Sequence, residues 1–376
     1  MYIPQKQIIN VKKYLMPQKA IIIYGPRRCG KTTLLQQLIK NINEKYLFIN
    51  GEDITTQNYL ASQSIQKLKN FVGKNRLLII DEAQCIKNIG INLKLMLDNI
   101  KGLKIIASGS SAFDLAHQLG EPLTGRKYTF ILYPLSQLEL NNIESSIETI
   151  ARLEMRLIYG SYPEVILCQD IKQNEFYLKE IISSYLYKDI LELEGIKYSD
   201  KLVRLLQCLA FQIGKEVSCT ELGTHLGMSK NTVDRYLDLL QKSFVLYRLN
   251  GFSRNLRKEV TKNSKYYFYD LGVRNALINN FNPLEMRNDI GMLWENYIII
   301  EILKKQEYQQ DFSNNYFWRT YDKKEIDFVV EKNANLFAYE IKWKNLKYKV
   351  PKDWKNVYKN SKFQLITKNN YLKFIA

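Results

Sequence analysis

Residues 20–39 read AIIIYGPRRCGKTTLLQQLI, and this stretch decides the fold of the first part of the chain. A short apolar run at 20–23 precedes the pattern G-x-x-x-x-G-K-T at 25–32, and apolar residues at helical spacing follow it. A strand, a glycine-bounded loop and a helix in that order are the context in which this pattern binds the phosphates of a nucleotide. The sequence therefore predicts a phosphate-binding loop rather than an ordinary strand-to-helix turn.

Positions of the loop have expected roles in holding a nucleoside triphosphate. Gly25 and Gly30 permit backbone conformations that a Cβ disfavours, so backbone N–H groups can turn inward around an anion. Lys31 should reach the β- and γ-phosphates, and the Thr32 hydroxyl should bind Mg²⁺. The predicted cofactors are ATP and Mg²⁺, and the predicted nucleotide-binding residues are Gly25, Pro26, Arg27, Arg28, Cys29, Gly30, Lys31, Thr32 and Thr33.

A second apolar run, at 77–80, ends in the two carboxylates Asp81 and Glu82. A buried parallel strand has this composition, and its carboxyl end delivers such acids to one edge of a sheet. We expect Asp81 to hold Mg²⁺ and Glu82 to orient and deprotonate the water that attacks the γ-phosphate. Such a strand is common by itself, but about 50 residues after a phosphate-binding loop it becomes a specific signal.

Two further segments could contribute to the nucleotide site. Residues 104–107 predict another strand, and Ser108 and Ser110 at its end could bind the attacking water or the γ-phosphate. The alternative is that this serine cluster caps the helix that follows. Arg126 is a candidate cation that neutralises charge on the γ-phosphate, from the same chain or across a subunit boundary. An ordinary surface arginine is the alternative for that residue.

Several motifs together resemble those of a bacterial and archaeal family of AAA-type ATPases: GPRRCGKTTLL, LLIIDEAQ, ASGSSA, LTGR with YPLS, and YGSYPEV. They cover most of residues 15–190. The resemblance implies a doubly wound parallel sheet with an extra strand between the two nucleotide motifs (Walker A and Walker B), a catalytic glutamate after the metal-binding aspartate, and a helical lid. Relatives often carry Arg at the position of Lys188. A contact that requires arginine at this position is therefore not expected in this chain.

The pattern changes between residues 197 and 270. A helix-period run at 201–213 precedes two short helical segments joined through Gly227, and the apolar runs 244–249 and 265–270 could form the two strands of a wing. This order predicts a winged helix-turn-helix, and the segment carries thirteen Lys or Arg against seven Asp or Glu. Docking onto a protein partner is the alternative to DNA binding. The predicted DNA-binding residues, at the start of the recognition helix, are Lys230, Asn231, Thr232 and Arg235.

The last third of the chain predicts a nuclease-like core. Glu295 lies on a predicted helix, Asp327 and Glu340 lie on successive predicted strands, and Lys342 faces the same side as Glu340. This is the order of the PD-(D/E)xK nucleases, and the family that the chain resembles usually ends in such a domain. We expect Asp327 and Glu340 to bind Mg²⁺, and the catalytic set to be Glu295, Asp327, Glu340 and Lys342. The alternative is an inactive remnant in which these acids pair with nearby lysines.

The composition favours a cytoplasmic protein with a polyanionic partner. The formal net charge is +17 over 376 residues, and residues 342–376 hold ten Lys and one Asp with aromatic residues interleaved. This suits a nucleic-acid backbone, and a solvated lysine face over aromatic core positions is the alternative. Five cysteines without C-x-x-C spacing favour reduced thiols, and two histidines argue against a His-based zinc site. No uncharged run reaches 18 residues, so membrane insertion is not expected.

Together these patterns predict an α/β protein with four parts. They are a P-loop AAA ATPase core at 1–135, a helical lid or linker at 136–196, a winged helix-turn-helix at 197–275 and a restriction-endonuclease-like α/β domain at 276–376. The predicted function is Mg²⁺-dependent ATP binding and hydrolysis coupled to DNA, with nuclease chemistry open. The alternative is a nucleotide-switched regulatory protein whose C-terminal modules bind only proteins. Either function is compatible with a protein partner or a homo-oligomer.

Overall fold

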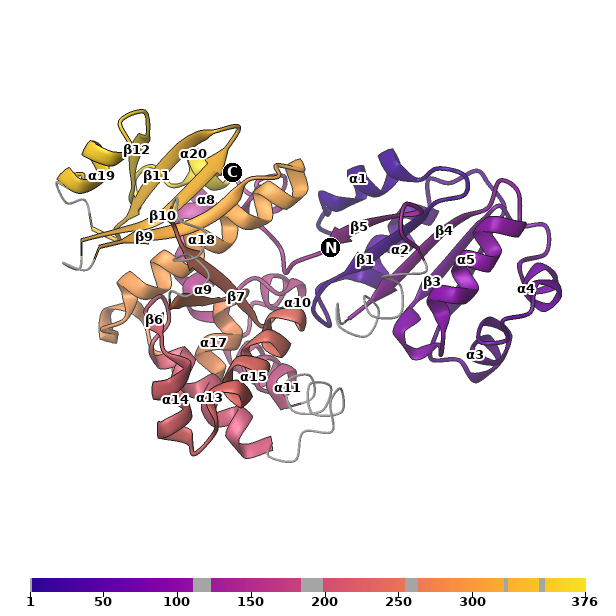
Figure 1. Cartoon of the computed structure of the whole chain (residues 1–376), viewed down its shortest axis with the longest axis horizontal. Coiled ribbons are helices and arrows are strands. Elements are labelled where there is room, and N and C mark those ends of the chain that lie inside the picture. The colour runs from indigo at the N-terminus through magenta and orange to yellow at the C-terminus, as the bar shows by residue number, and fades with distance from the viewer. Residues whose placement is uncertain (1, 111–122, 184–198, 254–262, 321–323, 345–348) are drawn as a thin grey trace. The chain divides into compact units, whose positions relative to one another are not determined.

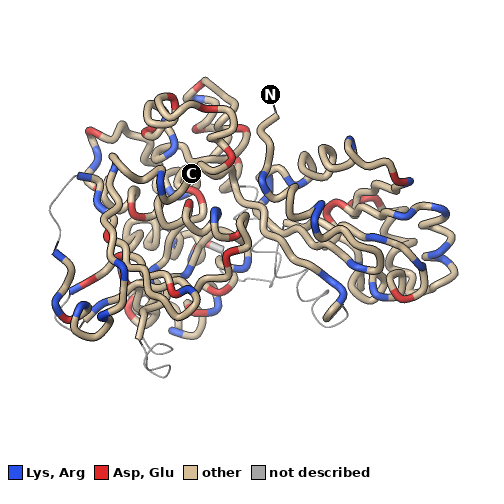
Figure 2. The backbone as a smooth tube through the Cα atoms, turned by 90° about the horizontal axis from the view of Figure 1, so that it is seen from above, with Lys and Arg blue, Asp and Glu red and all other residues tan. Residues whose placement is uncertain are grey.

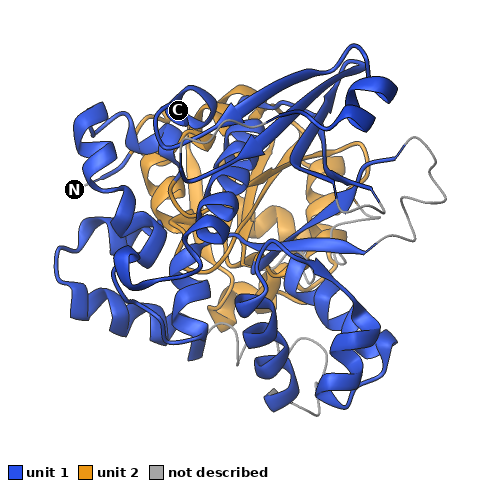
Figure 3. Cartoon of the chain, turned by 90° about the vertical axis from the view of Figure 1, so that its left-hand side faces the viewer, with its two compact units in different colours: residues 1–3, 136–241, 245–376 blue, residues 4–135, 242–244 orange. Residues whose placement is uncertain are grey.

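A computed structural model describes residues 2–110, 123–183, 199–253, 263–320, 324–344 and 349–376 (Figure 1). The chain forms two compact units (Figure 3). Unit 2 contains residues 4–135 and 242–244, and unit 1 contains residues 1–3, 136–241 and 245–376. The predicted position Lys188 lies outside the described residues.

Unit 2 is built on a sheet of five parallel strands. The strands lie in the order β2-β3-β4-β1-β5, with bounds β1 Ala20–Tyr24, β2 Tyr46–Asn50, β3 Leu77–Asp81, β4 Lys104–Gly109 and β5 Lys127–Ile131 (Figure 1). Every residue of β1 and β3 is buried, as expected for central strands of a parallel sheet. Because β4 lies between β1 and β3, the segments that follow these three strands leave the same edge of the sheet. The predicted α/β fold with a parallel sheet is confirmed.

The helices of unit 2 form where the sequence supplies an apolar stripe and a start signal. α2 buries Leu34 and Leu38 in the same core as Ile21 and Ile23 of β1, which explains the helical spacing after the loop. The Asp53 side chain accepts from the backbone N–H of Thr56, 2.7 Å away, and so begins α3. The elements are α1 Gln7–Tyr14, α2 Lys31–Ile39, α3 Ile54–Leu60, α4 Ile65–Val72, the 3-10 turn η1 Ala83–Cys85 and α5 Ile89–Asn99.

Unit 1 begins with five short helices, of which α7 and α8 start at capping boxes. The Ser136 and Ser145 hydroxyls accept from backbone N–H groups three residues on, and Glu139 and Glu148 bind back to the serine N–H groups. Of these helices, α9 and α11 pack on α17 (Leu271–Leu277), and the Asn275 amide of α17 donates to the carbonyls of Leu157 and Ile158 in α9. Their bounds are α7 Gln137–Leu140, α8 Ser146–Ala151, α9 Leu153–Tyr159, α10 Pro163–Leu167 and α11 Ile171–Ile181.

In the next segment of unit 1, the residues on either side of 254–262 form three helices and three strands. Gly227 ends α14 in the left-handed conformation, and the Ser229 hydroxyl accepts from the N–H of Thr232 at the start of α15. β7 and β8 pair antiparallel. The element order is α13 Ser199–Phe211, β6 Glu216–Val217, α14 Cys219–Leu226, α15 Lys230–Lys242, β7 Leu246–Gly251 and β8 Ser264–Phe268.

The strands of this segment continue into the C-terminal sheet, which the sequence pattern did not indicate. Seven strands lie in the order β12-β11-β10-β9-β7-β8-β6. The junction is a short parallel pairing of β7 with β9, and the N–H of Phe252 donates to the carbonyl of Phe317 at 2.6 Å. Segments 197–275 and 276–376, predicted as two domains, therefore share one sheet. The C-terminal elements are η3 Leu284–Met286, α18 Ile290–Gln309, β9 Asn314–Arg319, β10 Glu325–Lys332, β11 Asn335–Ile341, α19 Lys352–Val357, β12 Lys362–Ile366 and α20 Leu372–Ile375.

Across the described part of the chain, none of the helices combines the length and the apolar character needed to cross a membrane.

A tight turn after α9 depends on glycine. Gly160 has φ 77°, and a Cβ at this position would lie 2.1 Å from Asp270 Oδ1. The Asp270 carboxylate accepts from the N–H groups of Ser161 and Val273, at 2.7 and 3.1 Å, so it holds the turn and begins α17 at the same time. Burial raises the pKa of Asp270 above its usual value. The close approach of the backbone to this carboxylate leaves no room for a side chain.

We expect Gly160→Ala to lower the free energy of unfolding by about 2–5 kcal/mol, because left-handed strain adds to the clash with Asp270. Gly227→Ala is the matched control. Gly227 also has positive φ (62°), but only the flexible end of Lys201 lies within 4 Å, so the loss should be about 1–2 kcal/mol. Urea denaturation measures both changes, and equal losses in the two variants would contradict the close approach of Asp270.

Candidate functional site

The loop between β1 and α2 has the backbone of an anion-binding nest. Arg28 (φ 62°) and Gly30 (φ 101°) are both left-handed, and Gly30 directly precedes α2. Gly25 packs so closely on Leu132 that a Cβ would lie 2.1 Å from the Leu132 carbonyl oxygen. N–H groups of successive residues in such a turn point inward, and the helix adds the positive end of its dipole. The loop is therefore shaped to hold phosphate.

Two side chains of the loop are buried within it. Lys31 is 4% exposed, and its Nζ donates to the carbonyls of Gly25 and Pro26, both at 2.9 Å. A phosphate oxygen is a stronger acceptor than a carbonyl, so a bound polyphosphate can take over these donors. Burial raises the pKa of the Cys29 thiol to about 11, so this residue remains a neutral packing group. The loop thus carries its cation inside before any anion binds.

The carboxylate of Asp81 collects donors from three segments. Thr32 Oγ1 donates to Asp81 Oδ2 at 2.6 Å, the Ser108 hydroxyl donates to Oδ1, and the N–H of Glu82 lies 3.2 Å from Oδ1. The structure therefore brings together Thr32 and Asp81, the two residues predicted to bind Mg²⁺ at the nucleotide site. A hydroxyl and a carboxylate are hard oxygen ligands of the kind that Mg²⁺ prefers, so Thr32 and Asp81 are the residues that would hold the ion here.

Glu82 is oriented by a residue to which the sequence analysis assigned no role. Glu82 is left-handed (φ 51°), and its carboxylate accepts from the Gln84 amide at 2.5 Å. The same amide lies 3.3 Å from the Ser110 hydroxyl. Ser108 and Ser110 therefore hydrogen-bond with Asp81 and Gln84, beside Glu82. The segment that the serine cluster would cap in the alternative interpretation lies outside the described residues. Gln84 is the last residue of the LLIIDEAQ motif, and its place in that motif is the sequence feature that could have identified it.

Arg126 lies at the opposite edge of the sheet from the loop. Its carbonyl accepts from the N–H of Ala20, the first residue of β1, whereas the loop follows the last residue of that strand. A five-residue strand spans roughly 16 Å, so Arg126 does not reach the phosphates bound by its own chain. Its guanidinium instead pairs with Asp98 at 2.8 Å. The predicted action within one chain is therefore wrong, and action across a subunit boundary stays a prediction.

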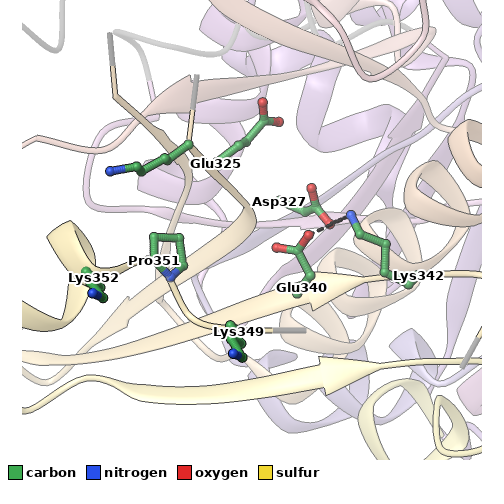
Figure 4. Close-up of a pocket in the computed structure, with 8 residues that line it drawn as sticks. Glu325, Asp327, Glu340, Lys342, Lys349, Pro351 and Lys352 are labelled. Carbon is green, nitrogen blue, oxygen red and sulfur yellow. Dashed lines mark hydrogen bonds and ion pairs between the residues drawn. The ribbon is translucent and has the colours of Figure 1, made fainter. Parts of the chain in front are cut away.

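A second candidate site is a cleft of about 750 Å³ in unit 1. Lys342 points into it together with Asp327 of β10 and Glu340 of β11, and the three side chains point toward one another (Figure 4). Lys342 Nζ lies 2.6 Å from Glu340 Oε1 and 3.2 Å from Asp327 Oδ2. Those two carboxylates outweigh the effect of burial and raise the pKa of Lys342. The full lining is Lys324, Glu325, Asp327, Glu340, Lys342, Lys349, Pro351 and Lys352.

A β-bulge places Asp327 in this cleft. Ile326 pairs with Trp318 and Val329 with Tyr316, so Asp327 and Phe328 together stand opposite one residue of β9. Bulges of this kind redirect a side chain that regular alternation would place elsewhere. The backbone N–H of Ile341 then donates to Asp327 Oδ2 at 2.8 Å and fixes the carboxylate between the two strands.

Glu295 does not join Asp327 and Glu340 as a third ligand. Its Oε1 accepts from Tyr267 Oη at 2.6 Å and lies 3.3 Å from Lys265 Nζ. Burial raises the pKa of Glu295, and Lys265 only partly opposes this effect. Within the described ranges, no group of three or more His, Cys, Asp or Glu side chains is arranged to hold a metal ion. Asp327 and Glu340, the two predicted metal ligands of this cleft, therefore lie together without Glu295, whose catalytic role stays a prediction.

Sequence analysis also missed Lys265, the buried cation of this region. It lies on β8 and pairs with Glu325 as well as Glu295. Burial by itself lowers the pKa of an ammonium group, but Glu295 and Glu325 outweigh burial and raise the pKa of Lys265. No local signal marks this lysine, because its partners lie 30 and 60 residues further along the chain.

The remaining basic features are on the surface. Lys230, Asn231 and Arg235 are exposed along α15, whereas Thr232 is half-buried beside its cap. Lysine and arginine positions occur throughout both units, so net charge alone selects no face (Figure 2). Among the C-terminal aromatic residues, Trp354 is fully buried and Trp343 packs edge-on against Trp294. These rings belong to the core, as the alternative interpretation expected.

Three family models match consecutive parts of the chain. Residues 17–141 match an AAA domain, residues 150–284 match a domain of unknown function (DUF8612), and residues 290–373 match a domain of unknown function (DUF4143). The first match includes the loop, Asp81 and Glu82.

Similar proteins extend over most of the chain. An uncharacterized protein of Methanocaldococcus jannaschii is 25% identical over 86% of this chain and 75% of its own length. An uncharacterized protein of Haemophilus influenzae is 27% identical over 94% of this chain and 88% of its own length. The replication initiator DnaA bound to AMPPCP and single-stranded DNA gives a TM-score of 0.31 at 17% identity, covering 62% of this chain and 86% of that one. That structural likeness is too low to carry an argument, whereas the family match supports an AAA-type ATPase domain at residues 17–141.

Proposed function

We propose that this chain is a Mg²⁺-dependent ATPase that engages nucleic acid through unit 1. One observation carries the first part of the proposal: the buried ammonium of Lys31, the Thr32–Asp81 pair and the oriented carboxylate of Glu82 meet at one edge of a sheet. A phosphate cradle, a place for a divalent cation and a base are the three parts that phosphoryl transfer to water requires. The AAA domain match at residues 17–141 supports the same reaction.

Each residue of this site has a distinct part in the proposed reaction. Loop N–H groups and Lys31 bind the β- and γ-phosphates, while Thr32 and Asp81 hold Mg²⁺, which when bound neutralises charge on the phosphate oxygens. Glu82 takes a proton from water as the water oxygen attacks the γ-phosphorus. The bond from that phosphorus to the bridging oxygen breaks, and ADP departs with the electron pair. Gln84 keeps the carboxylate of Glu82 aimed during this step.

Two variants separate binding from hydrolysis. Lys31→Ala should weaken Mg·ATP binding roughly 10- to 100-fold, because the variant has no ammonium group to donate to the phosphates. Glu82→Gln should retain binding and lose turnover by about 10²- to 10⁴-fold, because the amide cannot accept the proton. Titration calorimetry and phosphate release measure the two quantities. Glu44→Gln, at the far edge of the sheet, is the control. Comparable turnover in Glu82→Gln and the parent protein would contradict the assignment of the base.

The proposed DNA contact rests on the surface of α15. Its buried stripe faces the core, while Lys230, Asn231 and Arg235 remain exposed at its start. Together with the antiparallel pair of β7 and β8, this is the order of a winged helix-turn-helix, whose recognition helix presents such residues to base edges and phosphates. The competing proposal is that the same surface binds a protein and that the ATPase acts as a nucleotide-dependent switch.

Replacing both Lys230 and Arg235 by Ala should weaken duplex DNA binding. The slope of log affinity against log salt should become shallower by roughly 0.9 for each phosphate that the variant no longer neutralises. Lys172→Ala with Lys179→Ala on α11 removes the same charge from exposed positions elsewhere in unit 1 and is the matched control. Fluorescence anisotropy in a salt titration measures both pairs. An unchanged affinity and slope in the α15 variant would favour the protein-docking proposal.

The cleft of unit 1 is proposed to take a phosphodiester. Lys324, Lys349 and Lys352 line its walls, so a backbone phosphate would meet cations above Asp327 and Glu340. Two carboxylates fit one hydrated Mg²⁺ or Mn²⁺, and when bound such an ion activates water and stabilises charge on the phosphate. Lys342 is placed to stabilise the pentavalent phosphorus. The alternative is an inactive remnant of a nuclease, in which Lys342 is the permanent partner of Asp327 and Glu340.

Asp327→Ala distinguishes these alternatives. If the cleft is active, the variant should lose Mg²⁺- or Mn²⁺-dependent cleavage of DNA or RNA while ATP hydrolysis continues, because the ATP site lies in the other unit. Asp311→Ala removes a surface carboxylate that pairs with Lys332 and should leave cleavage intact. A gel assay with labelled single- and double-stranded substrates, with and without ATP, provides the readout. Absence of cleavage by the parent protein under all these conditions would establish the remnant.

A further inference from the structure

Gln5 lies against the phosphate-binding loop, on a segment that precedes α1. Its side chain is 4% exposed. Nε2 is the donor to the carbonyls of Cys29 and Gly30, at 3.3 and 3.4 Å. The approach is close enough that a Cβ on Gly30 would lie 2.6 Å from Nε2. One amide group therefore reaches two successive carbonyls of the loop.

These two carbonyls set the direction of two N–H groups. In a trans peptide group the C=O and the N–H point to opposite sides. The Cys29 carbonyl shares its peptide group with the N–H of Gly30, and the Gly30 carbonyl shares its group with the N–H of Lys31. The Gly30 carbonyl also accepts from the N–H of Leu34 at 2.9 Å, so the first turn of α2 already fixes that peptide group. When the Cys29 carbonyl turns toward Gln5, the N–H of Gly30 turns away from it. That side is the one on which an anion nest collects its donors.

The carbonyl end of the Gln5 side chain lowers the stability of the folded unit. Gln5 Oε1 is buried and has no hydrogen-bond partner among the described residues. A buried acceptor that has lost water without gaining a donor lowers the stability of the folded state. An apolar side chain of similar size would avoid this cost but would also lose both bonds of Nε2, so stability alone gives a glutamine little advantage here.

Gln7, two residues further on, shows what a structural glutamine looks like in the same segment. Its Nε2 donates to the carbonyl of Ile131 at 3.0 Å, and its Oε1 accepts from the Asn10 amide at 2.6 Å. Both ends of that side chain are used, and neither of these bonds involves the loop. The two residues therefore provide a test position and a matched control of the same type.

We propose that Gln5 is a positioning residue of the nucleotide site, which turns the N–H group of Gly30 toward the polyphosphate chain of a bound nucleoside triphosphate. The inference rests on the proposed nucleotide binding and adds a residue that lies outside the loop motif. Gln5 acts through the backbone of the loop and does not touch the phosphates. Its loss should therefore reduce affinity while leaving the fold intact.

The test compares Gln5→Leu and Gln5→Glu with Gln7→Leu and the parent protein in the full chain, with Mg·ATP as the probe. Gln5→Leu should weaken binding by about 5- to 50-fold, as expected when two hydrogen bonds are removed. Its Tm should stay close to that of the parent, because the loss of the Nε2 bonds and the removal of the unpaired Oε1 offset each other. Gln5→Glu keeps the shape but as a carboxylate cannot donate, so it should bind at least as weakly. Gln7→Leu should lower Tm and leave affinity within about twofold of the parent.

Calorimetry of Mg·ATP binding and a thermal melt without nucleotide give the two readouts. Parental affinity in Gln5→Leu would overturn this inference and leave the proposed ATPase standing. A lower Tm with unchanged affinity would assign Gln5 the structural role that Gln7 has. Absence of Mg·ATP binding by the parent protein would overturn the ATPase and this inference together.

Discussion

The nucleotide site depends on one carboxylate, that of Asp81. It accepts from Thr32 at the start of α2, from Ser108 at the end of β4 and from the N–H of Glu82. These segments meet only because β1, β4 and β3 are adjacent and parallel, so their carboxyl ends leave the same edge. All three donors are neutral groups, so they stabilise the negative charge of Asp81 by hydrogen bonding but do not neutralise it. A site of this kind retains its attraction for a cation.

The acids of unit 1 are compensated in a different way. Lys342 lies between Asp327 and Glu340, and Lys265 lies between Glu295 and Glu325. An ammonium group cancels the charge that neutral donors only distribute, so these acids already have cations supplied by the chain itself. A divalent ion that binds Asp327 and Glu340 must first displace Lys342. Carboxylates thus have only neutral partners around Asp81 in one unit and ammonium partners from the chain itself in the other.

The seven-stranded sheet connects the two proposed binding surfaces of unit 1. β7 and β8 follow α15 in the chain, and β10 and β11 carry Glu325, Asp327 and Glu340 of the cleft. Backbone hydrogen bonds at the β7–β9 junction join these parts, and Lys265 of β8 reaches across to acids of α18 and β10. A ligand on α15 and a ligand in the cleft would therefore act on one sheet, although the sequence divides the two segments.

The sequence by itself determined the features that depend on neighbours in the chain. The loop with its glycines, the apolar strands and the acids after β3 all follow from spacing over a few residues, because periodicity reports which face of an element is buried. Only the tertiary structure decided the partners of the charged side chains. In the folded chain Arg126 lies at the edge of the sheet opposite the loop and pairs with Asp98, Glu295 pairs with Lys265, and Gln5 contacts the loop. Those interactions join residues 24 or more positions apart, and which of many lysines or carboxylates meet is fixed by strand order and register, information that no local pattern contains.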